Sequence, residues 1–418
     1  MSGAPAAVAG RPAGAARPRR VRQRVLALLL VAALAAAAGL AFLTVAPNRL
    51  VTGTGVLLPA LWAGAAGAAG AEGAAWPAIW LMALLLPTAA LVVAVWLPPS
   101  RAVHAAVVMA ATALLTSFVA LAGAGAAMRA GTLPEIARVS LGGGCWVLAL
   151  LSWLAAGDAL QRLRLPPARH LAAHAAVLLP VVLLLASGAL DALSLLKEYE
   201  NRQDVFHAAG WRHLQIVLTA LLPALLIGVP LGVAAARQPR FAAPLFATLN
   251  LLQTVPSIAL FGLMIAPLAT LGEWLPGSGV RGIGLWPAVV ALVIYALLPI
   301  VHGTAAGLQQ VPAAVREAAT GMGLTPRQCF WRVDVPLALP VLLAGLRLTS
   351  VQLVGLAVVA ALIGAGGYGA LVFQGLLSSA LDLVLLGVLP VVALALAVDA
   401  GFTLLEAGLR RWPAEPAV

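Results

Sequence analysis

The chain has 418 residues, of which 62% are hydrophobic and only 9% are charged. Soluble proteins carry about 25% charged residues, so most of this chain cannot face water. A net charge of +11 would suit a nucleic-acid-binding protein if the cations formed one soluble patch, but here they flank apolar runs.

Ten apolar segments run for roughly 20 residues or more, which is long enough to cross the hydrocarbon core of a bilayer. Backbone polar groups inside a bilayer must be satisfied within the protein, so each run is predicted to be a helix. The predicted spans are 25–46, 75–97, 102–126, 141–161, 171–190, 214–235, 245–271, 286–306, 339–363 and 384–405. The predicted fold class is an all-α polytopic membrane protein.

Basic residues before the first predicted span indicate its orientation. They are Arg11, Arg17, Arg19, Arg20, Arg22 and Arg24. By the positive-inside rule the tail 1–24 lies in the cytoplasm, and ten spans place the tail 408–418 there too. The basic charge therefore reports orientation, and no nucleic-acid partner is expected. A cleaved signal peptide is the alternative for 25–46, but the apolar part of such a peptide is about 7–15 residues long.

A polar segment at 191–208 divides the chain and is predicted to be an extracytoplasmic linker. The Ala/Leu-rich part before it, 25–190, is interpreted as an accessory set of transmembrane helices. The spans after it contain prolines and amide side chains, which membranes tolerate where protein or a water-filled cavity satisfies the backbone. Ordinary kinks in packed helices are the other interpretation of this pattern.

Capping rules predict a helix–turn–helix in the loop 307–338, here called the EAA loop. Pro312 suits the first turn of a helix, and Gly323 suits the left-handed position after its end. Thr325 and the proline after it supply the N-cap and first residue of a second short helix, predicted to end at about Arg332.

The spacing of small and polar residues in the EAA loop is specific. The segment Glu317-Ala318-Ala319 is followed by Gly323 and by Val333-Asp334-Val335-Pro336. This resembles the signature of the permeases of binding-protein-dependent ABC importers, with valines replacing the usual isoleucine and leucine. The resemblance implies that the loop is the coupling helix that docks into a groove of the ATPase. It also implies that Glu317 is a polar anchor and that Ala318, Ala319 and Gly323 form a close-packing surface.

The resemblance extends over 209–407 and does not include the first 190 residues. Segments 250–263, 294–312 and 358–376 are similar to permeases for glycine betaine, proline and choline. The implied architecture is a type I importer core made by the last five spans. The implied solute is glycine betaine or a related quaternary amine, with an amino acid as the alternative.

Several motifs are missing from the sequence. A phosphate-binding loop needs Gly-Lys followed by Ser or Thr, and the single lysine, Lys197, lies between Leu196 and Glu198. We therefore expect ATP and Mg²⁺ on a separate ATPase subunit and no cofactor or metal in this chain. The solute-binding protein is also expected to be separate. The glycines of 363–370 resemble a nucleotide loop but are predicted to be a bend at the outer end of a span.

Residues that contact the solute are predicted from the two spans that flank the segment 272–285. The candidates are Asn250, Gln253, Pro256, Ser257, Tyr295 and Pro299. Aromatic faces would hold a quaternary ammonium, and Trp274, Trp286 and Tyr295 are available for this, although aromatics near span ends are usually interfacial anchors.

Two opposite charges lie inside the last two predicted spans. At about 1.5 Å per residue, Arg347 and Asp399 have similar depths of roughly 12 Å and 9 Å from the inner surface. Charges within a membrane are usually paired or functional, so we expect an ion pair that braces these helices. Separate snorkelling of each side chain to the interface is the alternative.

The sequence as a whole predicts a permease subunit of a bacterial inner membrane that catalyses no covalent reaction. It is expected to work as a pair, either with a second copy of itself or with a homologous permease. A membrane enzyme is the first rival, but the 14 acidic residues form no cluster of the kind it needs. A scaffold or sensor with a vestigial EAA loop is the second. An ATPase that co-purifies with the chain would distinguish a permease from both rivals.

Overall fold

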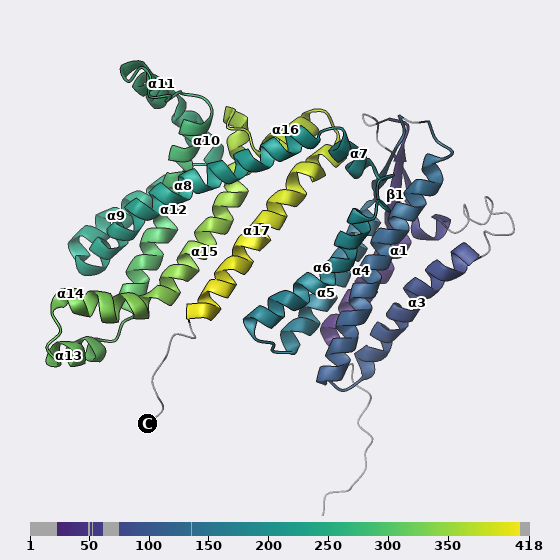
Figure 1. The fold of residues 1–418 in the computed structure, drawn as a ribbon, viewed down its shortest axis with the longest axis horizontal. Coiled ribbons are helices and arrows are strands. Elements are labelled where there is room, and N and C mark those ends of the chain that lie inside the picture. Colours follow the sequence, from purple (N-terminus) through teal and green to yellow (C-terminus); the bar gives the residue numbers. More distant parts are fainter. Residues whose placement is uncertain (1–22, 49–50, 52, 62–74, 135, 410–418) are drawn as a thin grey trace, which may run out of the picture. The chain divides into compact units, whose positions relative to one another are not determined.

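A computed structural model describes residues 23–409 except 49–50, 52, 62–74 and 135. Its helices and strands, drawn as a ribbon in Figure 1, fall into two compact units. Within the described residues, nine helical segments are long and apolar enough to cross a membrane, and a tenth apolar helix near the N-terminus is shorter. The helical polytopic fold expected from hydropathy is therefore confirmed.

The described part of the first unit comprises 23–45, 54–61, 75–129 and 141–190. Its helices are α1 (Arg24–Gly39), α3 (Ala75–Trp96), α4 (Arg101–Ala130), α5 (Gly143–Arg162) and α6 (Pro167–Ala186). The strands β1 (Ala41–Ala46) and β2 (Thr54–Leu57) of this unit pair with each other, and a third strand, β3 (Arg138–Leu141), has most of its residues in the second unit. Strand β1 is antiparallel to β2, with Thr44 opposite Gly55.

The predicted helical span 25–46 is wrong in its second half. Helix α1 ends at Gly39, and Leu40 adopts an extended conformation that leads directly into β1. Phe42 and Leu43 on this strand are fully buried. A continuous apolar run shows neither the helical nor the strand period, so the sequence could not distinguish the two structures here. The fold is consequently helical with a small β-sheet.

The second unit contains the described chain from Asp191 onward, together with residues of 46–53 and 130–140. Its first helices are α7 (Ser194–Glu200), α8 (Gln203–Arg237), α9 (Pro239–Thr254), α10 (Ser257–Leu263), α11 (Ile265–Trp274) and α12 (Leu285–Gln309). They are followed by α13 (Ala313–Gly321), α14 (Pro326–Cys329), a π-helical turn η2 (Phe330–Asp334) and α15 (Val335–Val359). A 3₁₀ turn η3 (Ala360–Ile363), α16 (Tyr368–Leu377) and α17 (Leu381–Leu409) complete it.

One predicted span in this unit differs from the structure. The predicted linker 191–208 holds α7 and the first residues of α8. The predicted span 245–271 is split into α9, α10 and α11. Pro256 has no N–H and disfavours the helical conformation at Val255, which is extended with φ −69° and ψ 126°.

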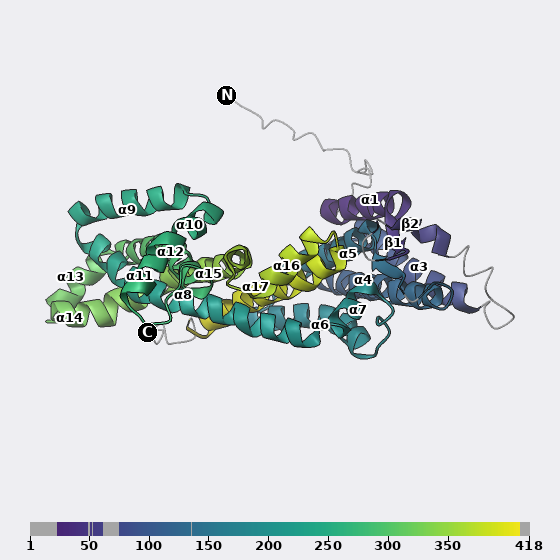
Figure 2. The ribbon, with the colours of Figure 1, turned by 90° about the horizontal axis from the view of Figure 1, so that it is seen from above.

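Helix α12 lies at the centre of the second unit. Figure 2 shows α9 and α10 on one side of it and α8 on the other. Its contacts with α8 and α15 pass through glycines: a Cβ on Gly232 would lie 2.5 Å from Thr304 Cβ, and one on Gly303 would lie 3.3 Å from the Cα of Gly345. Such small residues let membrane helices approach closely, since lipid gives no hydrophobic force to bring them together.

The glycine-rich segment 364–367 forms the predicted bend. Gly364, Gly366 and Gly367 have positive φ angles of 78°, 84° and 78°, which side chains disfavour. Arg212 Nε of α8 donates to the carbonyl of Ala365 at 2.8 Å and fixes the bend against that helix. Helix α16 follows directly, and the sequence did not predict it.

Candidate functional site

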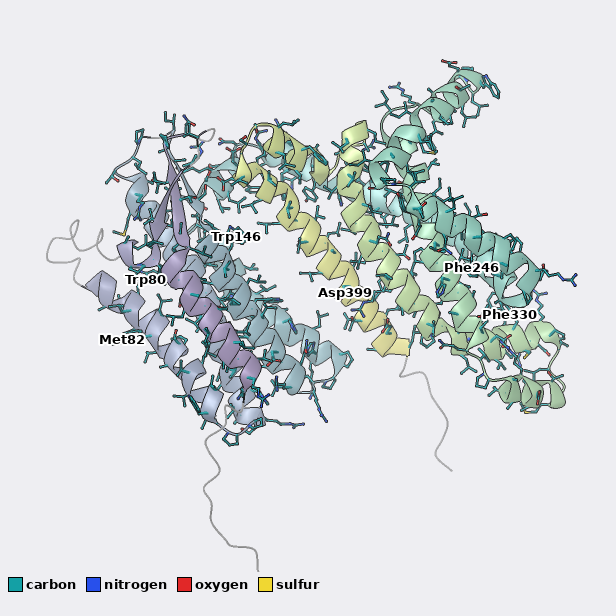
Figure 3. All side chains as sticks on the ribbon, turned by 180° about the vertical axis from the view of Figure 1, so that it is seen from behind. Trp80, Met82, Trp146, Phe246, Phe330 and Asp399 are labelled. Carbon is teal, nitrogen blue, oxygen red and sulfur yellow. The ribbon has the colours of Figure 1, made fainter. Side chains whose placement is uncertain are left out.

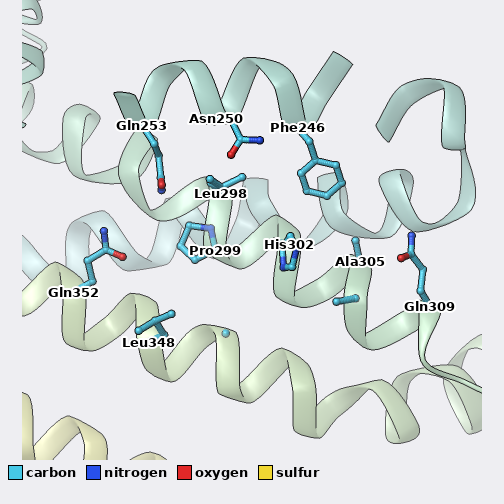
Figure 4. A pocket seen from close by; sticks show the side chains of 12 residues that line it. Phe246, Asn250, Gln253, Leu298, Pro299, His302, Ala305, Gln309, Leu348 and Gln352 are labelled. Carbon is cyan, nitrogen blue, oxygen red and sulfur yellow. The ribbon is translucent and has the colours of Figure 1, made fainter. Parts of the chain in front are cut away.

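A polar cavity of about 600 Å³ lies between α9, α12 and α15 (Figure 4). Helix α9 contributes Phe246, Asn250 and Gln253, which recur at helical spacing and point toward α12 in Figure 4. The other lining residues are Leu298, Pro299, His302, Ala305, Ala306 and Gln309 of α12 and Gly345, Leu348 and Gln352 of α15. The polar groups are amides and one imidazole, and the lining contains no Asp, Glu, Lys or Arg.

One wall of the cavity is fixed by two hydrogen bonds, and one of them replaces a helical bond lost at a proline. Pro299 has no N–H, so the carbonyl of Tyr295 one turn earlier has no helical donor. Gln253 Nε2 donates to this carbonyl at 3.0 Å. The hydroxyl of Tyr295 in turn donates to the carbonyl of Val255, where α9 ends. These hydrogen bonds therefore connect the proline site of α12 to the break between α9 and α10.

The structure separates the six predicted pathway residues into two groups. Asn250, Gln253 and Pro299 line the cavity. Tyr295 is buried in the core beside it, and Pro256 and Ser257 begin α10 outside the lining. Tyr295, Pro256 and Ser257 belong to the same predicted spans as the lining residues, but they do not lie on the faces of those spans that line the cavity.

Sequence reasoning missed several residues of the lining. His302 and Gln309 lie on the face of α12 that lines the cavity. Gln352 on α15 is the third polar residue that was missed. The ring of Phe246 packs edge-on against His302, with centroids 5.9 Å apart. The usable signal was the set of polar side chains at helical spacing within otherwise apolar spans.

The EAA loop forms two short helices, as its caps predict. Helix α13 begins directly after Pro312, and Gly323 has a φ of +84°. Thr325 caps α14 in a capping box: Gln328 N–H donates to its hydroxyl at 3.3 Å, and its own N–H donates to Gln328 Oε1 at 2.9 Å. The expected end at about Arg332 is wrong, because the π-helical turn η2 continues directly into α15.

An ion pair that the sequence did not predict closes the EAA loop. Arg316 Nε on α13 lies 2.7 Å from Asp334 Oδ1 on η2. The same guanidinium donates through Nη2 to the carbonyl of Leu308 at 2.7 Å. That carbonyl lacks the helical donor four residues on because Pro312 has no N–H, and its other backbone donors are the N–H of Val311, at 3.4 Å, and that of Gln310 at the helix end. Arg316 thus ties α12, α13 and the start of α15 together.

The predicted EAA-loop residues differ in exposure. Glu317, Ala318, Gly323 and Pro336 are exposed, and Val333 is half-buried. Ala319 is only 2% exposed, so it packs inside the subunit and cannot belong to the close-packing surface expected of it. No heavy atom lies within 4 Å of a Cβ on Gly323, so within this chain its backbone conformation, and not crowding, explains the glycine. Met322 is 75% exposed beside these residues and was not predicted.

Arg347 and Asp399 are in contact on adjacent helices. Arg347 Nε and Nη2 on α15 lie 2.5 Å and 2.7 Å from the two carboxylate oxygens of Asp399 on α17. Figure 3 labels Asp399 near the C-terminal end of α17. This bidentate geometry links the helix that leaves the EAA loop to the last helix of the chain.

Comparisons with known proteins agree with this arrangement. The family model of the binding-protein-dependent transport system inner membrane component matches residues 228–411. The osmoprotectant import permease protein OsmW of Salmonella typhimurium is 41% identical over 189 residues, which are 45% of this chain and 84% of that protein. The chain belongs to the binding-protein-dependent ABC importer permeases.

Other comparisons refine the family assignment. The model of the N-terminal domain of the ABC transporter permease YehY matches residues 21–196 of this permease. The carnitine transport permease protein OpuCB of Listeria monocytogenes is 38% identical over 196 residues, which are 47% of this chain and 84% of that protein. The glycine betaine/proline betaine transport system permease protein ProW of Escherichia coli is 36% identical over 204 residues, which are 48% and 54% of the two chains.

A solved structure of the MetNI methionine ABC transporter, in an inward-facing conformation, aligns over 51% of this permease and 99% of that chain. The TM-score is 0.46 and the sequence identity is 24%. Family membership makes the protein a multi-pass permease subunit of the inner membrane, and it implies an ATPase and a binding protein as partners.

Proposed function

We propose that this permease imports a small quaternary ammonium osmoprotectant, of which glycine betaine is the simplest. The named relatives transport osmoprotectants, carnitine, choline, or glycine betaine and proline betaine. Carnitine, choline and the betaines share a permanently charged ammonium with no N–H donor. A pathway for this class has to accept a bulky cation without relying on hydrogen bonds to it.

The chemistry of the cavity carries the proposal. A fixed carboxylate would hold a quaternary amine too strongly for rapid passage, and the lining contains none. Aromatic faces attract such cations moderately, and Phe246 and His302 supply them at the cavity wall. The amides of Asn250 and Gln352 can donate to the carboxylate that betaines also carry.

The EAA loop is the proposed contact with the ATPase. Exposed Glu317, Ala318 and Met322 form a small surface on and beside α13, and the Arg316–Asp334 ion pair holds it rigidly to η2. Because η2 continues into α15, movement of this surface would move Gly345, Leu348 and Gln352 in the cavity wall. The Arg347–Asp399 pair would carry the same movement to α17.

The remaining partners follow from the same proposal. A second permease, either another copy of this chain or a homologous permease, completes the proposed transporter. The EAA loop and both termini lie in the cytoplasm, and an extracytoplasmic protein delivers the solute. ATP and Mg²⁺ bind to the ATPase, and this chain catalyses no reaction and needs no cofactor of its own.

Uptake of radiolabelled glycine betaine tests the solute class. The permease is expressed with the ATPase and binding protein that co-purify with it, in cells lacking other betaine uptake. We expect unlabelled choline or carnitine to compete and methionine not to compete. Competition by methionine alone would overturn the proposed solute class while leaving the permease function intact.

A variant series tests the cavity. Gln352→Leu should lower uptake at unchanged expression because it removes a polar group from the wall, whereas Gly355→Ala on the same helix meets no atom within 4 Å and should have no effect. Equal uptake by both variants would exclude this cavity from the pathway.

A further inference from the structure

Three neighbouring hollows meet at Arg237 and Phe330, where α8 ends beside η2. The first is a furrow of about 520 Å³ between α8, α12 and α15. Most of its lining is apolar: Val229, Pro230, Val233, Ala234, Leu308, Val335, Leu339 and Leu342. The second is a hollow of about 680 Å³ against the EAA loop, and a smaller one of about 260 Å³ joins them. Figure 3 labels Phe330 at this meeting point.

The charges at this point are unbalanced. Arg237, Arg316 and Arg327 line the larger hollow with one carboxylate, Asp334. Asp334 is paired with Arg316, whereas neither Arg237 nor Arg327 has an ion-pair partner within the part of the chain that the structure describes. The guanidinium of Arg237 lies 4.4 Å from the centre of the Phe330 ring, which holds it in place. Stacking of this kind leaves its N–H donors available for an anion.

The furrow has the depth of one membrane leaflet. Its lining on α8 runs from Val229 to Arg237, which at about 1.5 Å per residue is roughly 12 Å. Half of a hydrocarbon core of about 30 Å is similar. Trp331 at the mouth is 60% exposed, as is typical of aromatic side chains at the membrane–water interface.

We propose that an anionic phospholipid of the cytoplasmic leaflet binds here, with its headgroup phosphate on Arg237 and Arg327 and one acyl chain in the furrow. The site lies on the α8 side of α12, whereas the polar cavity lies on the α9 side (Figure 2). The proposed lipid site therefore does not depend on which solute is carried. It rests on the proposed function only in requiring that the EAA loop faces the cytoplasm. A lipid held against η2 would stabilise one position of the joint between the EAA loop and α15.

Native mass spectrometry of the purified full chain tests the proposal, with phosphatidylglycerol and phosphatidylcholine titrated separately. We expect phosphatidylglycerol to bind at least tenfold more tightly. Arg237→Gln combined with Arg327→Gln should weaken it about 25-fold, since each arginine near an anionic headgroup contributes about fivefold. Arg240→Gln is the matched control, because this exposed arginine of α9 lines none of the hollows.

A second variant separates the furrow from the arginines. Ala234→Phe fills the furrow and keeps every charge, so it should also weaken phosphatidylglycerol binding at unchanged thermal stability. Equal affinity for the two lipids, or an equal effect of Arg240→Gln, would overturn the proposal. So would competition by soluble glycerol phosphate at the affinity of the intact lipid, which would indicate a free-anion site. If the Arg237→Gln and Arg327→Gln double variant still bound phosphatidylglycerol but no longer bound the ATPase, this surface would be assigned to the ATPase instead of a lipid.

Discussion

The ion pair between Arg347 and Asp399 allows a quantitative test of how the two last spans are held together. Removing one partner leaves the other charge alone within a span, which costs about 2.5–3.5 kcal/mol on insertion scales. The two side chains are 34% and 42% exposed, so polar groups from the interface reach the pair and reduce this penalty. We therefore expect a coupling free energy of about 2 kcal/mol in a double-mutant cycle.

The cycle combines Arg347→Met with Asp399→Leu, and unfolding in mixed micelles measures the free energy of each variant. Each single change should destabilise the protein, and the double variant should recover most of the loss. Arg162 and Asp158 on α5 are the matched control, since they are also bidentate, at 2.8 Å and 3.0 Å, but lie one turn apart on a single helix. Their coupling should be about 0.3–0.5 kcal/mol. An equally small value for Arg347 and Asp399 would refute the bracing role.

Three further substitutions test the local geometry, each by thermal unfolding in detergent. Gly323→Ala should cost about 1–2 kcal/mol because its φ is +84°, whereas Gly321→Ala inside α13 should be neutral or stabilising; equal effects would contradict the left-handed cap. Gly307→Ala should cost about 1–3 kcal/mol because its Cβ would lie 2.8 Å from a backbone oxygen of α15, and Gly355→Ala, with open space, should not destabilise; a neutral Gly307 variant would argue against tight α12–α15 packing. Gln253→Leu should cost about 1–3 kcal/mol because the carbonyl of Tyr295, which has no helical donor at Pro299, would lose its side-chain donor. No loss of stability would mean that water replaces the amide.

The long helices were predictable because length and hydropathy alone identify a membrane span. The same signal failed at 25–46 and 245–271, where each run is long and apolar enough on average for a span but a strand or a proline break divides it. The caps of the EAA loop were readable because Thr325 and Gly323 act through their own backbone neighbours. Local rules of this kind do not depend on the rest of the fold.

Contacts between distant segments were harder to predict. The similar depths of Arg347 and Asp399 were calculable, and the structure places the two side chains in contact. The pair Arg316–Asp334 was missed, since nothing in the sequence shows that the chain turns back across the EAA loop. Tyr295 was assigned to the pathway because it is polar and lies within a span, but its hydroxyl is used to close the gap between α9 and α10. The phase of α12 places Tyr295 in the core, and the position of a residue within a span does not reveal that phase.

The most direct test of the central claim is to measure glycine betaine uptake together with ATP hydrolysis in proteoliposomes that carry Ala318→Trp. This exposed residue of α13 lies on the proposed ATPase contact, and a bulky ring there should block docking without disturbing the fold. We predict that the ATPase no longer co-purifies, that solute-stimulated hydrolysis is lost and that uptake falls to background at unchanged thermal stability. Uptake and solute-stimulated hydrolysis at the wild-type rate would contradict the account.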